Sequence, residues 1–149
     1  MKRHESLAPL SREHHSALIL AQLLKKGTPA YKGLPSDIPG KIKYAMGMFN
    51  GSLKEHFRKE ELLIEKVRHC HADIERSGAD IIAEHEHLAT LFLNLDRSVN
   101  PVDSMDHLGN FLDMHIRKEE RVLFPLVQQH CPEEVLKEIE HLLNENETS

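Results

Sequence analysis

The sequence predicts an all-α protein, an up-down-up-down four-helix bundle with a short fifth helix at its C-terminal end. Three observations predict this fold. Apolar residues recur at alternating steps of four and three along four long segments, which places them on one face of each helix. Short connections join the segments, and none has the alternating pattern of a strand. With 149 residues the chain suits one hydrophobic core, so we expect a single domain over residues 1–149.

The first two helices are expected on either side of a long loop. The first should run from about Pro9 to Lys26, with Gly27 as its terminator. A loop rich in glycine and proline then reaches Gly40. The second helix is expected over about 39–68, where the helical spacing of apolar residues continues for some eight turns.

The remaining helices follow with short connections. The third helix is expected over about 73–98. Asn100-Pro101 is a favourable cap and first residue for a fourth helix that ends near His130. Cys131-Pro132 breaks the pattern, and two glutamates then suit the positive end of another helix. The core bundle should therefore cover about 9–131 and the C-terminal helix about 132–145.

Each long helix is expected to turn one stripe of residues toward the core. The stripe of the second helix contains Ile42, Met46, Phe49, Leu53, His56, Glu60, Leu63 and Val67. The stripe of the fourth helix contains Met105, Leu108, Leu112, His115, Glu119, Val122 and Leu126. The same rhythm places His14 in the stripe of the first helix and His85 in that of the third.

Composition and charge exclude several classes of function. The net charge is −5 with histidine neutral, and no basic block is longer than a pair, so neither a nucleic acid nor an anionic membrane is expected as a partner. The longest apolar run, Ala17 to Leu24, is too short to span a bilayer. Polar residues follow Lys2-Arg3 where a signal peptide needs an apolar stretch. These features predict a cytoplasmic protein.

Histidine is over-represented, with 12 residues against two tyrosines and no tryptophan. This excess suggests metal binding or proton chemistry. The polar members of the largely apolar stripes are the candidate ligands: His14, His56, Glu60, His85, His115 and Glu119. Glu60 follows His56 by four residues, as Glu119 follows His115, so each pair aims an imidazole and a carboxylate at the same point.

Two buried carboxylates that face each other are costly unless cations lie between them. Imidazole and carboxylate together suit iron, manganese or zinc. Two carboxylates can bridge a pair of metal ions while histidines bind at the two ends. Two six-coordinate ions have about twelve positions, and four histidines, two bridging carboxylates and one bridging oxygen would fill about ten, which leaves room for a small ligand.

At these residues the sequence resembles the hemerythrin-like (HHE cation-binding) family, and the resemblance covers nearly the whole chain. The matching segments are Arg12-Glu13-His14, His56-Phe57-x-x-Glu60-Glu61, Glu84-His85-Glu86-His87-Leu88 and His115-x-x-x-Glu119-Glu120 followed by Leu123-Phe124-Pro125. The resemblance implies the hemerythrin bundle and a non-haem site with two iron ions, oxo- or hydroxo-bridged. It also implies that the ligands are the same six residues.

The sequence departs from the respiratory hemerythrins at two positions. Those proteins have a His-x-x-x-His pattern on the third helix, whereas here Ala89 stands four residues after His85. They pair His-x-x-x-x-Asp on the fourth helix, whereas here His115 and Glu119 are four apart. One histidine ligand is thus missing. A more open site favours reaction with peroxide, or sensing of oxygen, nitric oxide or iron, over reversible oxygen carriage.

Other residues compete for the ligand roles. His15 adjoins His14, but the small residues Ala17 and Ala21 in the same register favour His14. Glu61 could replace Glu60 if the helix were rotated; otherwise Glu61 and Glu120 are solvated or support the ligands. Glu84 and His87 match the Glu-x-x-His spacing of ferritin-type sites, which need two such pairs.

The two cysteines are expected to be reduced thiols. Cys70 and Cys131 follow the ends of the second and fourth helices, which share one pole of an up-down bundle. A second soft-metal or redox site is conceivable there. Because these two helices lie diagonally opposite in such a bundle, we expect the thiols to be separated.

Three functions are consistent with these residues. The first is a di-iron protein that binds or senses a small oxidant: oxygen, peroxide or nitric oxide. Its site would be lined by apolar residues that exclude bulk water: Phe49, Leu53, Ile81, Leu88 and Leu112. The second is a peroxide-consuming di-iron enzyme. The third is a metal storage or interaction module without redox turnover. The sequence predicts neither the metal nor the oligomeric state.

Overall fold

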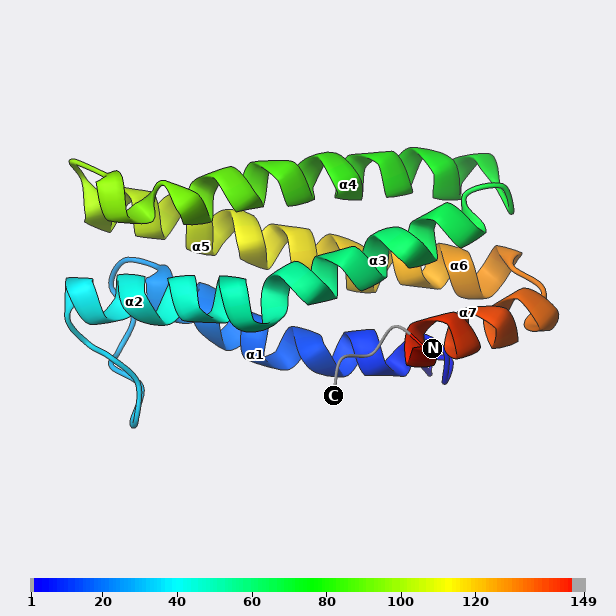
Figure 1. The fold of residues 1–149 in the computed structure, drawn as a ribbon, viewed down its shortest axis with the longest axis horizontal. Helices are drawn as coiled ribbons and strands as arrows, with labels where there is room; N and C mark the ends of the chain where they lie inside the picture. The colour runs from blue at the N-terminus through cyan, green and yellow to red at the C-terminus, as the bar shows by residue number, and fades with distance from the viewer. Residues whose placement is uncertain (1, 146–149) are drawn as a thin grey trace.

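Four long helical stretches run side by side in the computed structural model, which describes residues 2–145 (Figure 1). The first is α1 (Ala8–Leu24), and the third is α4 (Ala72–Leu93), which is followed by a 3₁₀ turn, η2 (Leu95–Arg97). The second stretch consists of α2 (Ile38–Met48), η1 (Phe49–Leu53) and α3 (Lys54–Val67). The fourth consists of α5 (Pro101–Lys118), η3 (Glu119–Leu123) and α6 (Phe124–His130). The last helix is α7 (Glu133–Glu145).

This arrangement confirms the predicted all-α bundle with a short C-terminal helix. The part of the chain that the structure describes contains no strand. Figure 1 shows α7 against the end of the bundle where α1 begins and α3 ends. The single-domain expectation also covers Met1 and residues 146–149, which lie outside the described residues. No helix within residues 2–145 combines the length and apolar character needed to cross a membrane.

Local signals explain most helix ends. Gly27 adopts a left-handed φ of 73° just after α1, and the Asp37 side chain caps α2 by accepting a hydrogen bond from the Gly40 amide at 3.0 Å. The His71 side chain caps α4 in the same way, by accepting from the Asp73 amide at 3.0 Å. Asn100 does precede α5, but its side chain makes no capping hydrogen bond.

The apolar core has two parts. One contains the C-terminal half of α1 with α2, η1, the end of α4 and the start of α5. The other contains the start of α1 with the end of α3, the start of α4, α6 and α7. Gly109 lets α5 approach α1 closely, because a Cβ there would lie 2.6 Å from the carbonyl oxygen of Ala21. The candidate ligands lie between these two apolar layers.

Two π-helical turns, η1 and η3, correct the predicted stripes. A π turn closes i→i+5 hydrogen bonds and so inserts one residue into the helical register. At the end of η3 and in α6 the buried residues are Leu123, Phe124 and Val127. Val122 is exposed, so the prediction that it faces the core is wrong, and the predicted Leu126 is only partly buried against the core. Before η1 the buried residue of α2 is Ala45, and the predicted Met46 is only partly buried. The predicted stripe positions that follow η1 in α3, and those that precede η3 in α5, are buried as predicted.

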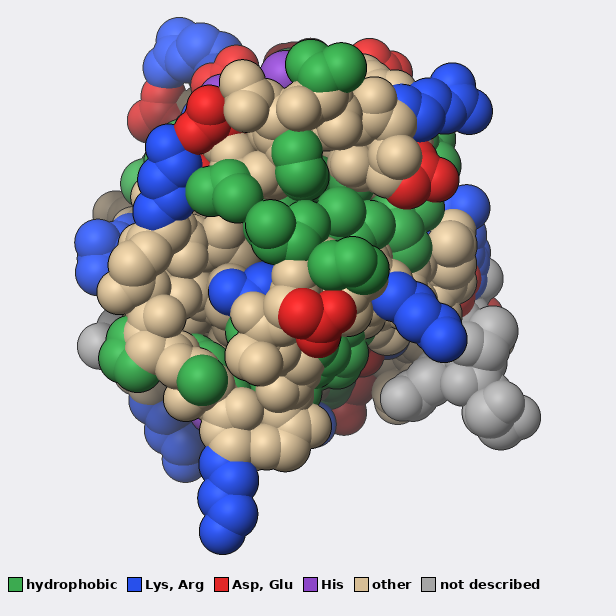
Figure 2. Space-filling model, turned by 90° about the vertical axis from the view of Figure 1, so that its left-hand side faces the viewer, with side chains coloured by type: hydrophobic (Ala, Val, Ile, Leu, Met, Phe, Trp, Pro, Cys, Tyr) green, Lys and Arg blue, Asp and Glu red, His purple; other side chains and the backbone are tan. Residues whose placement is uncertain are grey.

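One end of the bundle exposes apolar side chains. Figure 2 shows hydrophobic groups gathered on the left-hand end of Figure 1, where the loop between α1 and α2 and the connection between α4 and α5 lie. Exposed residues of these segments include Tyr31, Ile38, Val99 and Val102. One of the two core layers separates this end from the candidate ligands.

Candidate metal centre

The structure brings all six predicted side chains together in the middle of the bundle. The exposed fraction of every one is 5 % or less, although they come from different helices. The six are His14 of α1, His56 and Glu60 of α3, His85 of α4, His115 of α5 and Glu119 of η3. Helical spacing of four residues explains why Glu60 lies above His56, and Glu119 above His115, on the same helix face.

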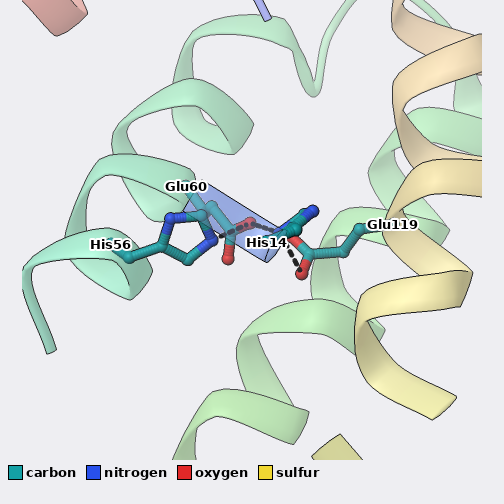
Figure 3. A group of neighbouring side chains, drawn as sticks. All are labelled: His14, His56, Glu60 and Glu119. Carbon is teal, nitrogen blue, oxygen red and sulfur yellow. Dashed lines mark hydrogen bonds and ion pairs between the residues drawn. The ribbon is translucent and has the colours of Figure 1, made fainter. Parts of the chain in front are cut away.

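The six side chains form two groups of four that share both carboxylates. One group is His14, His56, Glu60 and Glu119 (Figure 3). The other is His85, His115, Glu60 and Glu119. Within each group the potential ligand atoms all lie within 4.8 Å of one another. Glu60 and Glu119 therefore lie where two bridging carboxylates between two metal ions would lie.

The Nε2 atoms of all four histidines face the shared carboxylates. His56 and His85 place Nε2 2.9 Å and 3.0 Å from oxygens of Glu60, and His115 places Nε2 2.9 Å from Glu119. His14 Nε2 lies 3.1 Å from Glu60 and 3.5 Å from Glu119.

Several of these close contacts are not hydrogen bonds. His56 Nε2, His115 Nε2 and both carboxylate oxygens of Glu119 are buried and have no partner in hydrogen-bonding geometry among the described residues. Buried polar atoms are normally paired, since an unpaired one costs about 1–3 kcal/mol. Nitrogen and carboxylate oxygen atoms that converge without such pairing are the donor set of a metal site, so the residues present fit a bound cation.

Four further glutamates hold the other ring nitrogen of each histidine. His14 Nδ1 donates to Glu120 at 2.9 Å, and His56 Nδ1 donates to Glu13 at 2.7 Å. Likewise, His85 Nδ1 donates to Glu61 at 2.8 Å, and His115 Nδ1 donates to Glu84 at 2.7 Å. Each acceptor adjoins a ligand candidate in sequence but contacts a histidine on a different helix. These contacts form a closed ring around the bundle, from α1 to α3, from α3 to α4, from α4 to α5, and from η3, which continues α5, back to α1.

This ring fixes which nitrogen is free to bind. A histidine that donates from Nδ1 to a carboxylate presents the Nε2 lone pair on its opposite side when it is neutral. All four Nε2 atoms then point to the interior of the cluster. Outer carboxylates of this kind orient metal-binding histidines and make them better donors.

Two lysines donate hydrogen bonds to two of the outer carboxylates, on opposite sides of the bundle. Lys59 Nζ donates to Glu13 at 2.7 Å, and Lys118 Nζ donates to Glu84 at 2.7 Å. On a third side Glu120 accepts from Ser11 at 2.7 Å and pairs with Arg3 at 3.3 Å. Burial would raise the pKa values of Glu13, Glu84 and Glu120, but hydrogen bonds from the histidines, and then those from Lys59, Lys118 and Ser11, hold them below the usual range.

The metal-free cluster binds protons tightly. Burial alone would lower the pKa of His14, but close contacts with the carboxylates of Glu119, Glu120 and Glu60 raise it to about 12. Similar contacts raise the pKa values of His56 and His115 to about 9, again against burial. Burial opposes charge on Glu60, but the charge of His56 holds its pKa well below the usual range. These protons occupy the interior that cations would occupy, so metal binding must displace them.

The two central carboxylates differ. Burial and the neighbouring charge of Glu60 raise the pKa of Glu119. In the metal-free protein one carboxylate is therefore charged and the other tends to hold a proton, as expected when two buried carboxyl groups share a site.

Aromatic rings cover two of the histidines. Phe57 stacks on His85 with ring centroids 4.2 Å apart, and Phe124 stacks on His14 at 5.8 Å. The residues expected to line the site, Phe49, Leu53, Ile81, Leu88 and Leu112, are all buried. The sequence analysis did not identify Phe57 or Phe124 as ring contacts, because ring stacking depends on side-chain direction and not on register alone.

The competing candidates lie elsewhere. His15 is exposed, and so is His87, whose ring meets Phe111 edge-on at 4.7 Å. Glu61 and Glu84 are outer partners of His85 and His115, so neither faces the interior of the cluster. The ferritin-type reading of Glu84 and His87 is therefore wrong for this fold.

A repeated segment could have revealed the outer carboxylates. Residues 56–61 read His-Phe-Arg-Lys-Glu-Glu, and residues 115–120 read His-Ile-Arg-Lys-Glu-Glu. Glu13-His14 and Glu84-His85 repeat a shorter pair. Each half of the chain thus supplies one Glu-His pair and one longer segment, and the structure places the two sets on opposite sides of Glu60 and Glu119.

The expectation that the two thiols are separated is wrong. Cys131 belongs to the second core layer, and Cys70 packs against that layer close enough to act on the Cys131 thiol. Burial, together with the adjacent Cys70, raises the pKa of Cys131 to about 12. The next residues also meet, since the rings of His71 and His130 stack with centroids 3.9 Å apart. The residues after α3 therefore meet the end of α6 at this pole, although the two helices belong to diagonally opposite stretches of the bundle.

Comparison with known proteins agrees with this geometry. The profile of the family described as hemerythrin HHE cation binding domain matches residues 5–127. The match begins just before α1 and ends within α6, so it contains all six central residues and the four outer glutamates. The chain has no significant match among curated proteins or solved structures.

Proposed function

Because this chain belongs to the hemerythrin HHE cation-binding family, we propose that it holds two iron ions between Glu60 and Glu119 and binds or senses a small oxidant. Oxygen, peroxide and nitric oxide are the candidate ligands. The supporting observation is the convergence of unpaired Nε2 and carboxylate atoms in two groups that share both carboxylates. His14 and His56 would bind one ion, and His85 and His115 the other. Manganese and zinc suit the same donors.

The arrangement leaves room for a ligand beside each metal. Each group offers two histidines and two shared carboxylates, whereas iron usually takes about six ligands. When bound, iron supplies the redox centre at which such an oxidant reacts. The chain itself contributes a dry interior, since the layers above and below the cluster consist of buried apolar side chains. Small diatomic molecules enter such an interior more readily than charged solutes do.

Metal analysis combined with spectroscopy tests the proposal. Protein expressed without added metal should contain close to two metal ions per chain, with iron dominant. The iron-loaded protein should show a ligand-to-metal charge-transfer band that changes when oxygen, peroxide or nitric oxide is added. Protein that binds iron and gains thermal stability, yet never changes its spectrum, would instead be a storage or structural module. Protein that binds no metal would refute all of these functions.

Turnover of peroxide is the second candidate, and Ala89 is the residue that favours it. It stands four residues after His85, where a histidine would add a ligand to the second metal. A metal with two histidines has more room for exchangeable ligands than one with three. Peroxide consumption should then be lost in His115→Ala and kept in His15→Ala, since His15 is exposed. Equal loss in both variants would contradict catalysis at this site.

A further inference from the structure

A polar cavity opens beside one of the candidate ligands. Its volume is about 250 Å³, and it lies between α1 and the stretch formed by η1 and α3. Its walls contain Glu13, Ser16, Gly51, Ser52, Leu53, Glu55, His56 and Lys59. His56 is the member of the cluster that forms part of this wall, and its Nε2 faces Glu60 on the inner side. One imidazole ring therefore separates the cavity from the metal-binding interior.

Glu13 closes the inner side of the cavity. Its carboxylate accepts from His56 Nδ1 and from Lys59 Nζ, both at 2.7 Å. Its side chain is 37 % exposed, whereas Lys59 and His56 are almost fully buried. Of these three side chains, Glu13 is therefore the one that can turn toward the cavity while its carboxylate stays hydrated. Glu55 adds a second carboxylate to the same wall.

The directions along the bundle axis are closed to a charged solute. Apolar layers cover the cluster on both sides, and a hydrated cation would lose its water in crossing them. A cavity lined by carboxylates and hydroxyls avoids this cost, since oxygen ligands can replace the water molecules one at a time.

We propose that this cavity is the port through which hydrated divalent cations reach the cluster, with Glu13 as the carboxylate that passes them inward. This inference rests on the proposed function, because a port requires a metal site. Glu55 and Glu13 bind the incoming ion, Glu13 exchanges its contacts with His56 and Lys59 for the ion, and His56 then admits it to Glu60. Lys59 compensates the charge of Glu13 while the port is empty.

The π turn at η1 supplies a position for testing the port. Gly51 lies in this turn and lines the cavity, and a Cβ added to it would meet nothing within 4 Å. Gly51→Leu should therefore fill the cavity without disturbing the fold. Gly47→Leu is the matched control, because a Cβ at Gly47 also meets nothing within 4 Å, yet Gly47 lines a different groove on α2.

The experiment measures metal exchange in the loaded protein. Co²⁺ is the probe, because its visible absorption reports binding without any redox reaction. Its release is followed with an excess of chelator, its uptake by stopped-flow mixing, and its affinity by titration. A narrower port raises one barrier that entry and exit share, so Gly51→Leu should slow both about tenfold or more and leave the affinity unchanged. Gly47→Leu should match the unaltered protein.

Each alternative result overturns the port. Unchanged rates in Gly51→Leu mean that the ion enters elsewhere. A changed affinity with an unchanged uptake rate means that the substitution acts on the cluster itself. Equal slowing in both variants means a general effect of leucine on the helix. Failure of the unaltered protein to bind Co²⁺ would refute the proposed function, and the port would fall with it.

A second inference concerns the paired thiols, and it is independent of the metal centre. Cys70 is half-buried and Cys131 is buried, and both pack in the second core layer at the pole where α3 and α6 end. The stacked rings of His71 and His130 hold the two chain segments together on one side. Face-to-face stacking keeps their nitrogens from converging, and His71 Nδ1 already caps α4. The four side chains therefore do not form a metal site.

We infer that this pair is a dithiol that hydroperoxides oxidise to a disulfide. The more accessible Cys70 attacks the peroxide, the O–O bond breaks, and a sulfenic acid and one water form. Cys131 then attacks that sulfur, so that the S–S bond forms and the second water leaves. Two thiols and one hydrogen peroxide give one disulfide and two waters.

Mass spectrometry after treatment with hydrogen peroxide tests the dithiol. The oxidised chain should lose two hydrogens and give a peptide in which Cys70 is linked to Cys131. Cys131→Ser should accumulate a trappable sulfenic acid at Cys70, and Cys70→Ser should react at least about tenfold more slowly. Further oxidation of Cys70 without a crosslink would overturn the inference, as would faster oxidation of Cys131 than of Cys70.

Discussion

The two halves of the metal centre are built alike but are exposed differently. In each half a histidine, a lysine three residues later and two glutamates lie on one helix, and a Glu-His pair comes from a neighbouring helix. The contacts match to within 0.1 Å: Glu13 lies 2.7 Å from His56 and from Lys59, and Glu84 lies 2.7 Å from His115 and from Lys118. A pseudo-twofold arrangement of this kind makes the two groups of candidate ligands equivalent.

The surroundings break this equivalence. The cavity lies against the first half, where Glu13 is 37 % exposed, whereas Glu84 in the second half is 13 % exposed. Phe57 stands where the second half has Ile116, and its ring stacks across the cluster on His85. The π turn of the first half precedes His56, and that of the second begins at Glu119. The duplicated side chains thus make the two groups of candidate ligands alike, whereas the unequal surroundings make one side of the cluster more accessible than the other.

Removal of a shared carboxylate should have the largest effect, because it affects both halves at once. Glu60→Gln and Glu119→Gln should each weaken binding of both metals by more than about 100-fold. They should differ in the metal-free protein. Glutamine resembles a protonated carboxyl group, so Glu119→Gln should leave thermal stability nearly unchanged, whereas Glu60→Gln removes the charge that His56 and His14 pair with. Metal analysis and thermal unfolding measure the two effects, and two metals retained in either variant would contradict the shared role.

Removal of one histidine should affect one half. His56→Ala should leave the metal held by His85 and His115, and His85→Ala should leave the metal held by His14 and His56. The stoichiometry should fall from two to one in each case. The pairing can be read from double variants, because His14→Ala with His56→Ala should still bind one ion, but His56→Ala with His85→Ala should bind none tightly. Any other pattern would mean that the histidines are paired differently.

The six central residues could be predicted from the sequence. The four outer glutamates could not be predicted from the helical register alone. The stripes selected all six central residues, because His and Glu are unusual at positions where the helical register is otherwise apolar. The outer glutamates adjoin those residues in sequence yet contact another helix, so their partners depend on which helices are neighbours. Val122 is exposed and Leu126 is only partly buried because a π turn shifts the register without any sequence signal as strong as proline or glycine.

The metal-free protein should lose stability as the pH rises. A histidine whose pKa is higher in the fold than in the unfolded chain stabilises the fold fully below its unfolded pKa of 6.5, and this contribution declines as the pH approaches the folded pKa. His56 and His115 should therefore stop contributing near pH 9, while His14, with a pKa of about 12, contributes beyond it. Thermal unfolding between pH 6 and 10 measures this decline. With metal bound the decline should disappear, because the metal replaces these protons.

The smallest effects should come from the outer carboxylates, and they should differ between sites. Glu84→Gln should weaken metal affinity by about 10–100-fold, because it loosens His115 and removes the closer of the two carboxylates that the partly buried Lys118 contacts. Glu61→Gln should cost less than about tenfold, since Glu61 is 43 % exposed and water can take over its contact with His85. Competition with a chelator of known affinity measures both. A larger loss in Glu61→Gln would show that orientation of the ring, and not burial of its partner, sets the strength of each histidine.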